Sequence, residues 1–367
     1  MTRRGLLGLV PQAALLSSVL SEKKNQALPQ AGEFVRFADP TTEAIVVRLT
    51  SPAYTNILPL PVNRFASLKP RLLMCSSDRG GGRLQPFQID LRTGAIRQIA
   101  EADALDASSL TLDAQSRFVY FLDGLELVES GLPGRKESKR TRVLAKNVSA
   151  FGIGASPSQL FTISAGGALQ RVSDNGASVL ATDAAGPCLV RPPAGAGCLF
   201  ARSLAGDERE YWYAAADPAH GKPVLLARGR VSNPCWSGGG ESVLFLRDVP
   251  KANIFLSEVH EIKPEEGIER CVSKTSQFAT FNPNGNGSVF VGASGSKAQP
   301  NVVLLLRLTQ RELTLCEHRS SHPSDVRPAF SPDSRRVYFQ TDREGKPAIY
   351  SVNVEQLVEP TEADVRG

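Results

Sequence analysis

The stretch FSPDSRRVYFQTDREGKPAIYSVNV, residues 330–354, has the pattern of one unit of a repeated β-sheet. Its residues 331–334, Ser-Pro-Asp-Ser, predict a turn, because Pro presets one φ angle and the Asp and Ser side chains bond nearby amides. The run RVYFQT, 336–341, is rich in β-branched and aromatic residues, as strands are. Asp-Arg-Glu-Gly at 342–345 predicts a second turn, and 348–354 alternates like another strand. The stretch therefore predicts short strands joined by tight turns.

Six degraded copies of this unit precede it in the chain. They lie at residues 72–100, 110–130, 151–181, 188–216, 234–259 and 279–308. Seven units spaced at about 40 to 50 residues match the blades of a β-propeller, in which each blade is a sheet of four short strands. A blade cannot cover its own two faces, so the blades must stack around a ring. We expect one all-β domain, a seven-bladed β-propeller over residues 32–367, closed by an N-terminal strand (44–49) that pairs into the blade of residues 330–354.

Composition agrees with an all-β chain and disfavours some functions. The 367 residues are 41% hydrophobic, and 31 Gly with 25 Pro suit many turns. No long run after residue 30 has helical apolar spacing, which disfavours α/β architectures. The net charge of +5 is spread along the chain, whereas a nucleic-acid surface needs clustered Lys and Arg. The one basic cluster, residues 135–140, lies between strand-like runs, so we expect an exposed hairpin loop there and no nucleic-acid partner.

The N-terminus has the pattern of an export signal. Arg3 and Arg4 precede a short apolar stretch that ends near Leu20, which resembles a twin-arginine signal. Pro11 interrupts this stretch, which is too short and broken for a good membrane span. We therefore expect residues 1–31 to be an export signal, with a disordered leader as the alternative. The mature chain is then expected to be exported to the periplasm, without a membrane span.

The six cysteines show no CxxC pair, which disfavours a zinc ribbon or a redox motif. Most lie inside apolar, strand-like runs and are expected to be small buried hydrophobes. Cys188 and Cys198 flank a predicted hairpin turn at 192–195. A cross-strand disulfide between them is the alternative to two buried thiols.

Two stretches carry a resemblance to known families. FSPDSRRVYFQTDREGKPAIY resembles the repeat of TolB-type propellers, and FVRFADPTTEAIVVRLTSP (34–52) with LLMCSSDRGG (72–81) resembles the start of oligogalacturonate lyases. The second likeness covers most of residues 32–356 in order and spacing. It implies β-elimination on galacturonate oligomers, in which a divalent metal, typically manganese, binds the uronate carboxylate and a histidine removes the C5 proton. This chemistry is sound, because a neutralised carboxylate acidifies the neighbouring proton and a neutral imidazole can accept it.

The reactive positions of that family differ in this chain. Where its last blade carries Gln-x-x-His-x-His-Pro, this chain reads HPSDVRP at 322–328. Only His322 and Asp325 could still bind a metal there, and Arg327 would repel one. In the fifth blade Asn233 stands near the position of a family histidine.

Two further segments of the lyase pattern are also changed. A Cys-His-Glu-Gly segment of the fourth blade is replaced by ARSL at 201–204, and NILPL at 56–60 stands where histidines precede an aromatic strand. The whole chain has four histidines, at positions 220, 260, 318 and 322. A site made of three imidazoles is therefore not expected, and we predict that the purified protein holds no stoichiometric manganese or zinc.

Three hypotheses follow. The first is a non-catalytic propeller that binds an acidic oligosaccharide, without metal, at the mouth of its central channel. Its candidate ligand-binding residues are Arg202, Asn233, His322, Asp325 and Arg327. The second is an active oligogalacturonate lyase with an altered site, in which His322 is the base or a manganese ligand and arginines pair the substrate carboxylates. The third is a TolB-like scaffold that binds a protein partner.

Each candidate residue also has an ordinary structural interpretation. Arg202 and Arg327 could be surface charges, Asn233 could cap a turn, and His322 beside Pro323 could be a loop residue. The sequence leaves these alternatives open.

Overall fold

The computed structural model describes residues 32–359 except residues 70, 137–139, 157–158, 174–175, 194, 252–253 and 275–276. The predicted export signal, residues 1–31, lies outside this part of the chain. The described chain is all-β, and its helical parts are two single 3₁₀ turns, η1 (Pro218–His220) and η2 (Pro323–Asp325). None of the described helices is long and apolar enough to cross a membrane.

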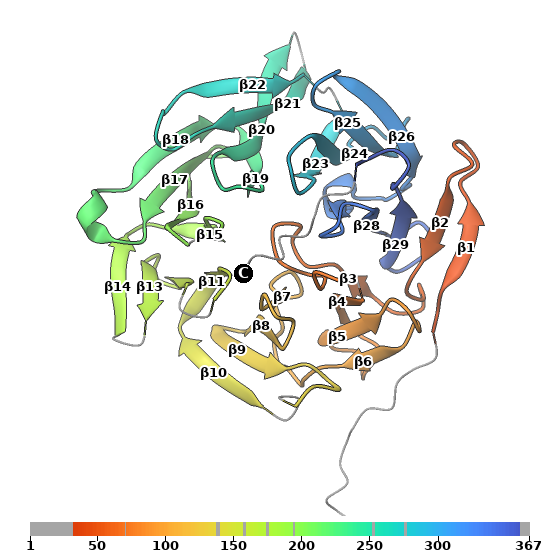
Figure 1. Ribbon diagram of the computed structural model, residues 1–367, viewed down its shortest axis with the longest axis horizontal. Coiled ribbons are helices and arrows are strands. Elements are labelled where there is room, and N and C mark those ends of the chain that lie inside the picture. The colour runs from red at the N-terminus through yellow and green to blue at the C-terminus, as the bar shows by residue number, and fades with distance from the viewer. Residues whose placement is uncertain are drawn as a thin grey trace, which may run out of the picture.

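Seven antiparallel sheets stand around a ring, one for each repeat unit (Figure 1). From the inside outwards, blade 1 contains β3 (Asn56–Ile57), β4 (Leu72–Ser77), β5 (Gln85–Asp90) and β6 (Ile96–Gln98). Blade 2 contains β7 (Thr111–Leu112), β8 (Phe118–Asp123), β9 (Glu126–Gly131) and β10 (Thr141–Lys146). Blade 3 contains β11 (Val148–Ile153), β12 (Leu160–Ser164), β13 (Leu169–Ser173) and β14 (Gly176–Ala181).

The remaining blades follow the same plan. Blade 4 contains β15 (Ala185–Val190), β16 (Gly197–Ser203), β17 (Arg209–Ala215) and β18 (Val224–Gly229). Blade 5 contains β19 (Val231–Trp236), β20 (Val243–Lys251), β21 (Ile254–Ile262) and β22 (Glu269–Ser273). Blade 6 contains β23 (Phe278–Pro283), β24 (Val289–Ser294), β25 (Asn301–Leu306) and β26 (Arg311–Glu317). The predicted seven-bladed propeller is confirmed.

Blade 7 combines both ends of the described chain. Its strands run in the order β27 (Ala329–Phe330), β28 (Arg336–Thr341), β29 (Ala348–Asn353), β2 (Ile45–Arg48) and β1 (Val35–Ala38). The N-terminal strand β2 pairs antiparallel with β29, with Val46 opposite Val352. In Figure 1 the red strands β1 and β2 accordingly lie beside the blue strand β29.

The hydrophobic core lies between adjacent blades. Alternate side chains of β28 point to opposite neighbours: Val337 and Phe339 pack with Val291 of blade 6, whereas Tyr338 packs with Leu73 of blade 1. Because both faces of this sheet are covered, β28 is buried from Val337 to Thr341, which explains three consecutive apolar or aromatic residues at 337–339.

The repeated turn has a common chemistry. In the unit of residues 330–354, the Ser331 hydroxyl accepts a hydrogen bond from the Arg336 amide at 3.0 Å, and Ser334 takes a φ of 58°. In blade 2 the Asp113 carboxylate accepts from the Phe118 amide at 3.0 Å. A short polar side chain thus replaces a backbone acceptor at the start of each of these two turns.

Candidate functional site

The loop after β3 crosses the central channel. Residues 58–65, here called the channel segment, leave blade 1, and the Leu60 amide bonds the Ser108 carbonyl before blade 2 at 3.0 Å. On the far side Val62 packs against the cores between blades 4 and 5 and between blades 5 and 6. Pockets on the two sides of this segment share the residues Pro61, Val62 and Asn63. The segment therefore divides the channel.

One of these pockets, here called the mouth pocket, opens where the inner strands begin. Its volume is about 410 Å³, within the range of small-molecule sites. The channel segment and the starts of β11, β15 and β19 line it. Its polar side chains include Asp106, Ser108, Arg209 and Asn233. The mouth pocket is therefore a polar, partly enclosed site of the kind that binds a hydrophilic ligand.

Irregular backbone surrounds the mouth pocket. Four inner strands carry a register shift near their first residues: Val148/Ala150 in β11, Ala185/Leu189 in β15, Ser232/Cys235 in β19 and Phe278/Thr280 in β23. β-Bulges are common beside binding and active sites, since they change the direction of side chains. The end of the channel at the mouth pocket therefore has the irregular backbone that is typical of a binding site.

Asn233 lines this pocket, and Arg327 bonds one of the lining residues from behind. Both have positive φ angles, 52° and 48°, which are uncommon outside glycine. Asn233 lines the pocket, and its Nδ2 donates to the Ala279 carbonyl at 3.3 Å. Arg327 lies behind the lining: its Nη1 donates to the Ser108 hydroxyl at 2.8 Å. Burial lowers the pKa of Arg327, and the nearby Asp325 and Asp106 oppose that shift, so the guanidinium stays charged.

The structure does not bring Arg202 to this site. Its guanidinium stacks 4.4 Å from the Trp212 ring centre, and its Nη2 donates to the Thr182 carbonyl of blade 3 at 3.0 Å. Among the described residues that line the mouth pocket, Arg209 supplies the cation from blade 4 instead. The residue pattern does not indicate that Arg209 and not Arg202 lines the pocket. The two arginines occupy neighbouring strands, and the direction of each side chain determines which one reaches the pocket.

His322 and Asp325 stand outside the pocket lining as well. Both are exposed, His322 directly before η2 and Asp325 within it. His322 Nδ1 lies 2.8 Å from the Ser321 hydroxyl. No histidine is among the described side chains that line the mouth pocket.

His318 is a core residue. It is fully buried; its Nε2 lies 3.1 Å from the Ser294 carbonyl, and its Nδ1 accepts from the Ser320 amide at 3.0 Å. These partners suit a neutral ring. Burial lowers the pKa of His318 below its ordinary value of 6.5, against opposing contributions from the Ser294 carbonyl and Asp342.

This environment predicts an acid-sensitive fold. Below pH about 6.5 His318 takes up a proton in the unfolded chain but stays neutral in the folded chain. The free energy of unfolding therefore falls as the pH falls, and this group contributes up to about 1.4 kcal/mol per pH unit. We expect His318→Gln to remove that part of the pH dependence in denaturant titrations. His220→Gln, the same substitution at an exposed histidine, is the control. An unaltered profile for His318→Gln would contradict the assignment.

Five of the six cysteines are buried, as expected, and Cys271 is exposed. The Cys188 and Cys198 sulfur atoms lie 3.3 Å apart as thiols. Cys188 also lines the mouth pocket.

No family model and no curated protein matches the sequence. The fold is similar to that of an oligogalacturonate lyase in complex with manganese, with a TM-score of 0.75 and 16% identity over 89% of this chain and 97% of that chain. It is similar to oligogalacturonate lyase from Vibrio parahaemolyticus, with a TM-score of 0.76 and 16% identity over 89% of this chain and 98% of that one. Hydrazine synthase from Kuenenia stuttgartiensis is more distant, with a TM-score of 0.56, 12% identity and coverage of 80% and 95%. At these identities the likeness establishes the propeller fold.

Proposed function

We propose that this propeller binds an acidic oligosaccharide of the oligogalacturonate type at the mouth pocket and does not cleave it. The proposal draws on the fold likeness to two proteins named for oligogalacturonate. Its second support is the chemistry of the pocket. We further propose that the chain is exported, on the Arg3-Arg4 pattern, so that it meets such a polymer outside the cytoplasm.

The observation that carries the proposal is a polar pocket that holds an arginine and an amide side chain and whose described lining holds no imidazole. Arg209 can pair a uronate carboxylate in bidentate fashion, and Arg327 adds positive charge from behind Ser108. Asn233 and Asp106 offer groups that bond sugar hydroxyls. β-Elimination needs a base within hydrogen-bond reach of the C5 proton, and His322 does not line the pocket. Binding without elimination fits this set of residues best.

Calorimetry with oligogalacturonate tests the proposal. We expect Arg209→Ala to weaken binding about ten-fold or more, because a hydrogen bond to a charged group contributes about 1.5–3 kcal/mol. Arg327→Ala should also weaken binding, because it removes the positive charge behind Ser108. Arg202→Ala is the matched control from the same blade, and it should bind like the wild type because its guanidinium lies on Trp212. EDTA should leave the affinity unchanged.

Other results would select another function. Undetectable binding at millimolar oligogalacturonate would contradict the sugar-binding proposal and favour a scaffold that binds a protein partner. An unsaturated product, or binding abolished by EDTA, would instead restore a metal-dependent lyase.

A further inference from the structure

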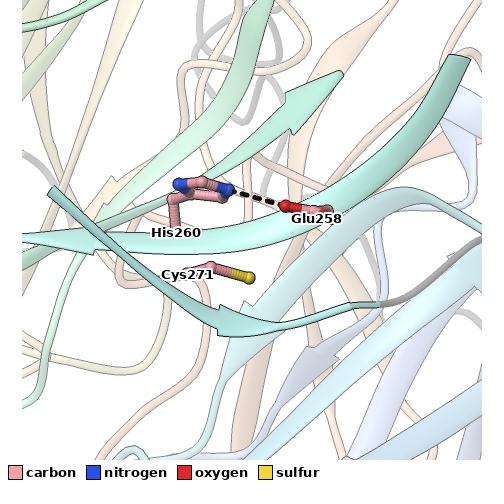
Figure 2. Close-up of side chains that lie close together, drawn as sticks. All are labelled: Glu258, His260 and Cys271. Carbon is pink, nitrogen blue, oxygen red and sulfur yellow. Dashed lines mark hydrogen bonds and ion pairs between the residues drawn. The ribbon is translucent and has the colours of Figure 1, made fainter. Parts of the chain in front are cut away.

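Three side chains with metal-binding atoms meet on the outer strands of blade 5, away from the channel. Glu258 and His260 lie on β21 and Cys271 lies on β22 (Figure 2). One ligand atom from each lies within 4.8 Å of the other two. They form the one such group among the described residues. An oxygen, a nitrogen and a sulfur atom therefore lie close together at the rim of the propeller.

The strand register brings these residues together. Glu258 and His260 are two positions apart, so they lie on the same face of β21. Cys271 is the direct cross-strand partner of His260. The register shifts between Val259 and His260, next to this pair. Cross-strand partners on one face have neighbouring Cβ atoms, which places the thiol beside the imidazole.

Further contacts hold the imidazole of His260 in place. The ring is buried and packs against Phe245, with ring centres 5.9 Å apart. Its Nε2 lies 3.1 Å from Oε2 of Glu258. On the other side its Nδ1 lies 2.6 Å from Oε1 of Glu269.

Glu269 is itself fixed by Arg247. The Arg247 Nε and Nη2 donate to the two carboxylate oxygens at 2.5 and 2.7 Å. Protein-bound metals commonly use a histidine whose other nitrogen meets a carboxylate, since that partner sets the tautomer and orients the ring. Here Arg247 holds Glu269, and Glu269 contacts Nδ1 of His260, as in that arrangement. The other ring nitrogen, Nε2, is then directed at Glu258.

We propose that Glu258, His260 and Cys271 bind one Zn²⁺ ion, with Glu269 as the positioning residue for His260. Thiolate, imidazole and carboxylate together suit zinc, and three protein ligands leave a fourth tetrahedral position for water. On binding, the Cys271 thiol releases its proton to solvent and the thiolate coordinates the metal. The site links β21 to the edge strand β22. It revises the sequence-based expectation of no bound zinc, which rested on the changed lyase positions and on the small number of histidines.

Metal titration of the purified full-length chain tests the proposal. After removal of bound metal by chelation, we expect the wild type to take up one equivalent of Zn²⁺ by calorimetry. With Co²⁺ as the probe we expect a near-ultraviolet thiolate-to-cobalt band. Cys271→Ser, at an exposed position, should lose both the band and one-to-one binding while keeping the metal-free melting temperature. Glu269→Gln should keep the band and weaken Zn²⁺ binding about 10- to 100-fold.

The control is His220→Ala, which removes an exposed histidine beside Asp217 and should leave metal uptake unchanged. The proposal is overturned if the wild type takes up no equivalent of Zn²⁺. It is equally overturned if Cys271→Ser retains the cobalt band, which would place the metal at another cysteine such as the Cys188 and Cys198 pair.

Discussion

Val46→Asp is expected to lower the free energy of unfolding by more than about 4 kcal/mol. Val46 lies on β2, is fully buried, and packs in the core between blades 6 and 7. An Asp there must either bury an unpaired charge or take up a proton, and it also leaves the volume of the valine poorly filled. Urea titrations followed by circular dichroism measure the effect.

The neighbouring residue provides the control. Ile45 is on the same strand, one position earlier, and the residue is 56% exposed. Ile45→Asp should therefore stay within about 0.5 kcal/mol of the wild type. Equal stability of the two variants would mean that β2 does not contribute a buried face to blade 7 in solution.

The fold could be predicted from the sequence because its determinants are local. Six of the seven blades are runs of consecutive strands, and turn residues such as Ser331 and Asp113 act on amides five residues away. The double-sided burial of β28 also leaves a signature, since Val337, Tyr338 and Phe339 put apolar or aromatic side chains on both faces of the strand. Only blade 7 required a contact between distant segments.

Most residues of the candidate sites could not be predicted from the sequence, because side-chain direction and strand register bring them together. Arg202 and Arg209 are similar by composition, yet one stacks on Trp212 and the other lines the mouth pocket. The proposed zinc ligands, Glu258, His260 and Cys271, have no zinc-finger spacing. Their approach depends on the pairing of β21 with β22, where a register shift intervenes. Side-chain direction and register, rather than residue type, decided both sites.

A buried ion pair fixes the N-terminal segment to blade 1. The Arg79 side chain is fully buried, and its Nη1 and Nη2 donate to the two oxygens of Glu33 at 2.9 and 3.3 Å. Nη2 also donates to Oδ1 of Asn56 at 2.8 Å, and the guanidinium lies 5.0 Å from the Tyr54 ring centre. The Glu33 carboxylate in turn accepts from the Ser51 amide at 2.6 Å. Glu33 thus joins two parts of the chain that flank β1 and β2.

We expect Glu33→Ala to lower the free energy of unfolding by about 3 kcal/mol, because it removes the countercharge of the buried Arg79 guanidinium. Asp103→Ala is the control, since it breaks the exposed pair of Asp103 with Arg83, at 3.3 Å, and should cause little change in denaturant titrations.

The double variant Glu33→Ala/Arg79→Met tests whether the loss comes from the buried charge of Arg79 or from the lost contacts of Glu33. Removing both partners leaves no buried charge, and the Asn56 carbonyl oxygen keeps its hydrogen bond from the Ser77 hydroxyl at 3.0 Å. An apolar side chain of similar length can also pack against Tyr54 and Phe87, which now cover the guanidinium. We therefore expect the double variant to recover most of the loss caused by Glu33→Ala. A double variant no more stable than Glu33→Ala alone would contradict the assignment of the loss to the buried charge.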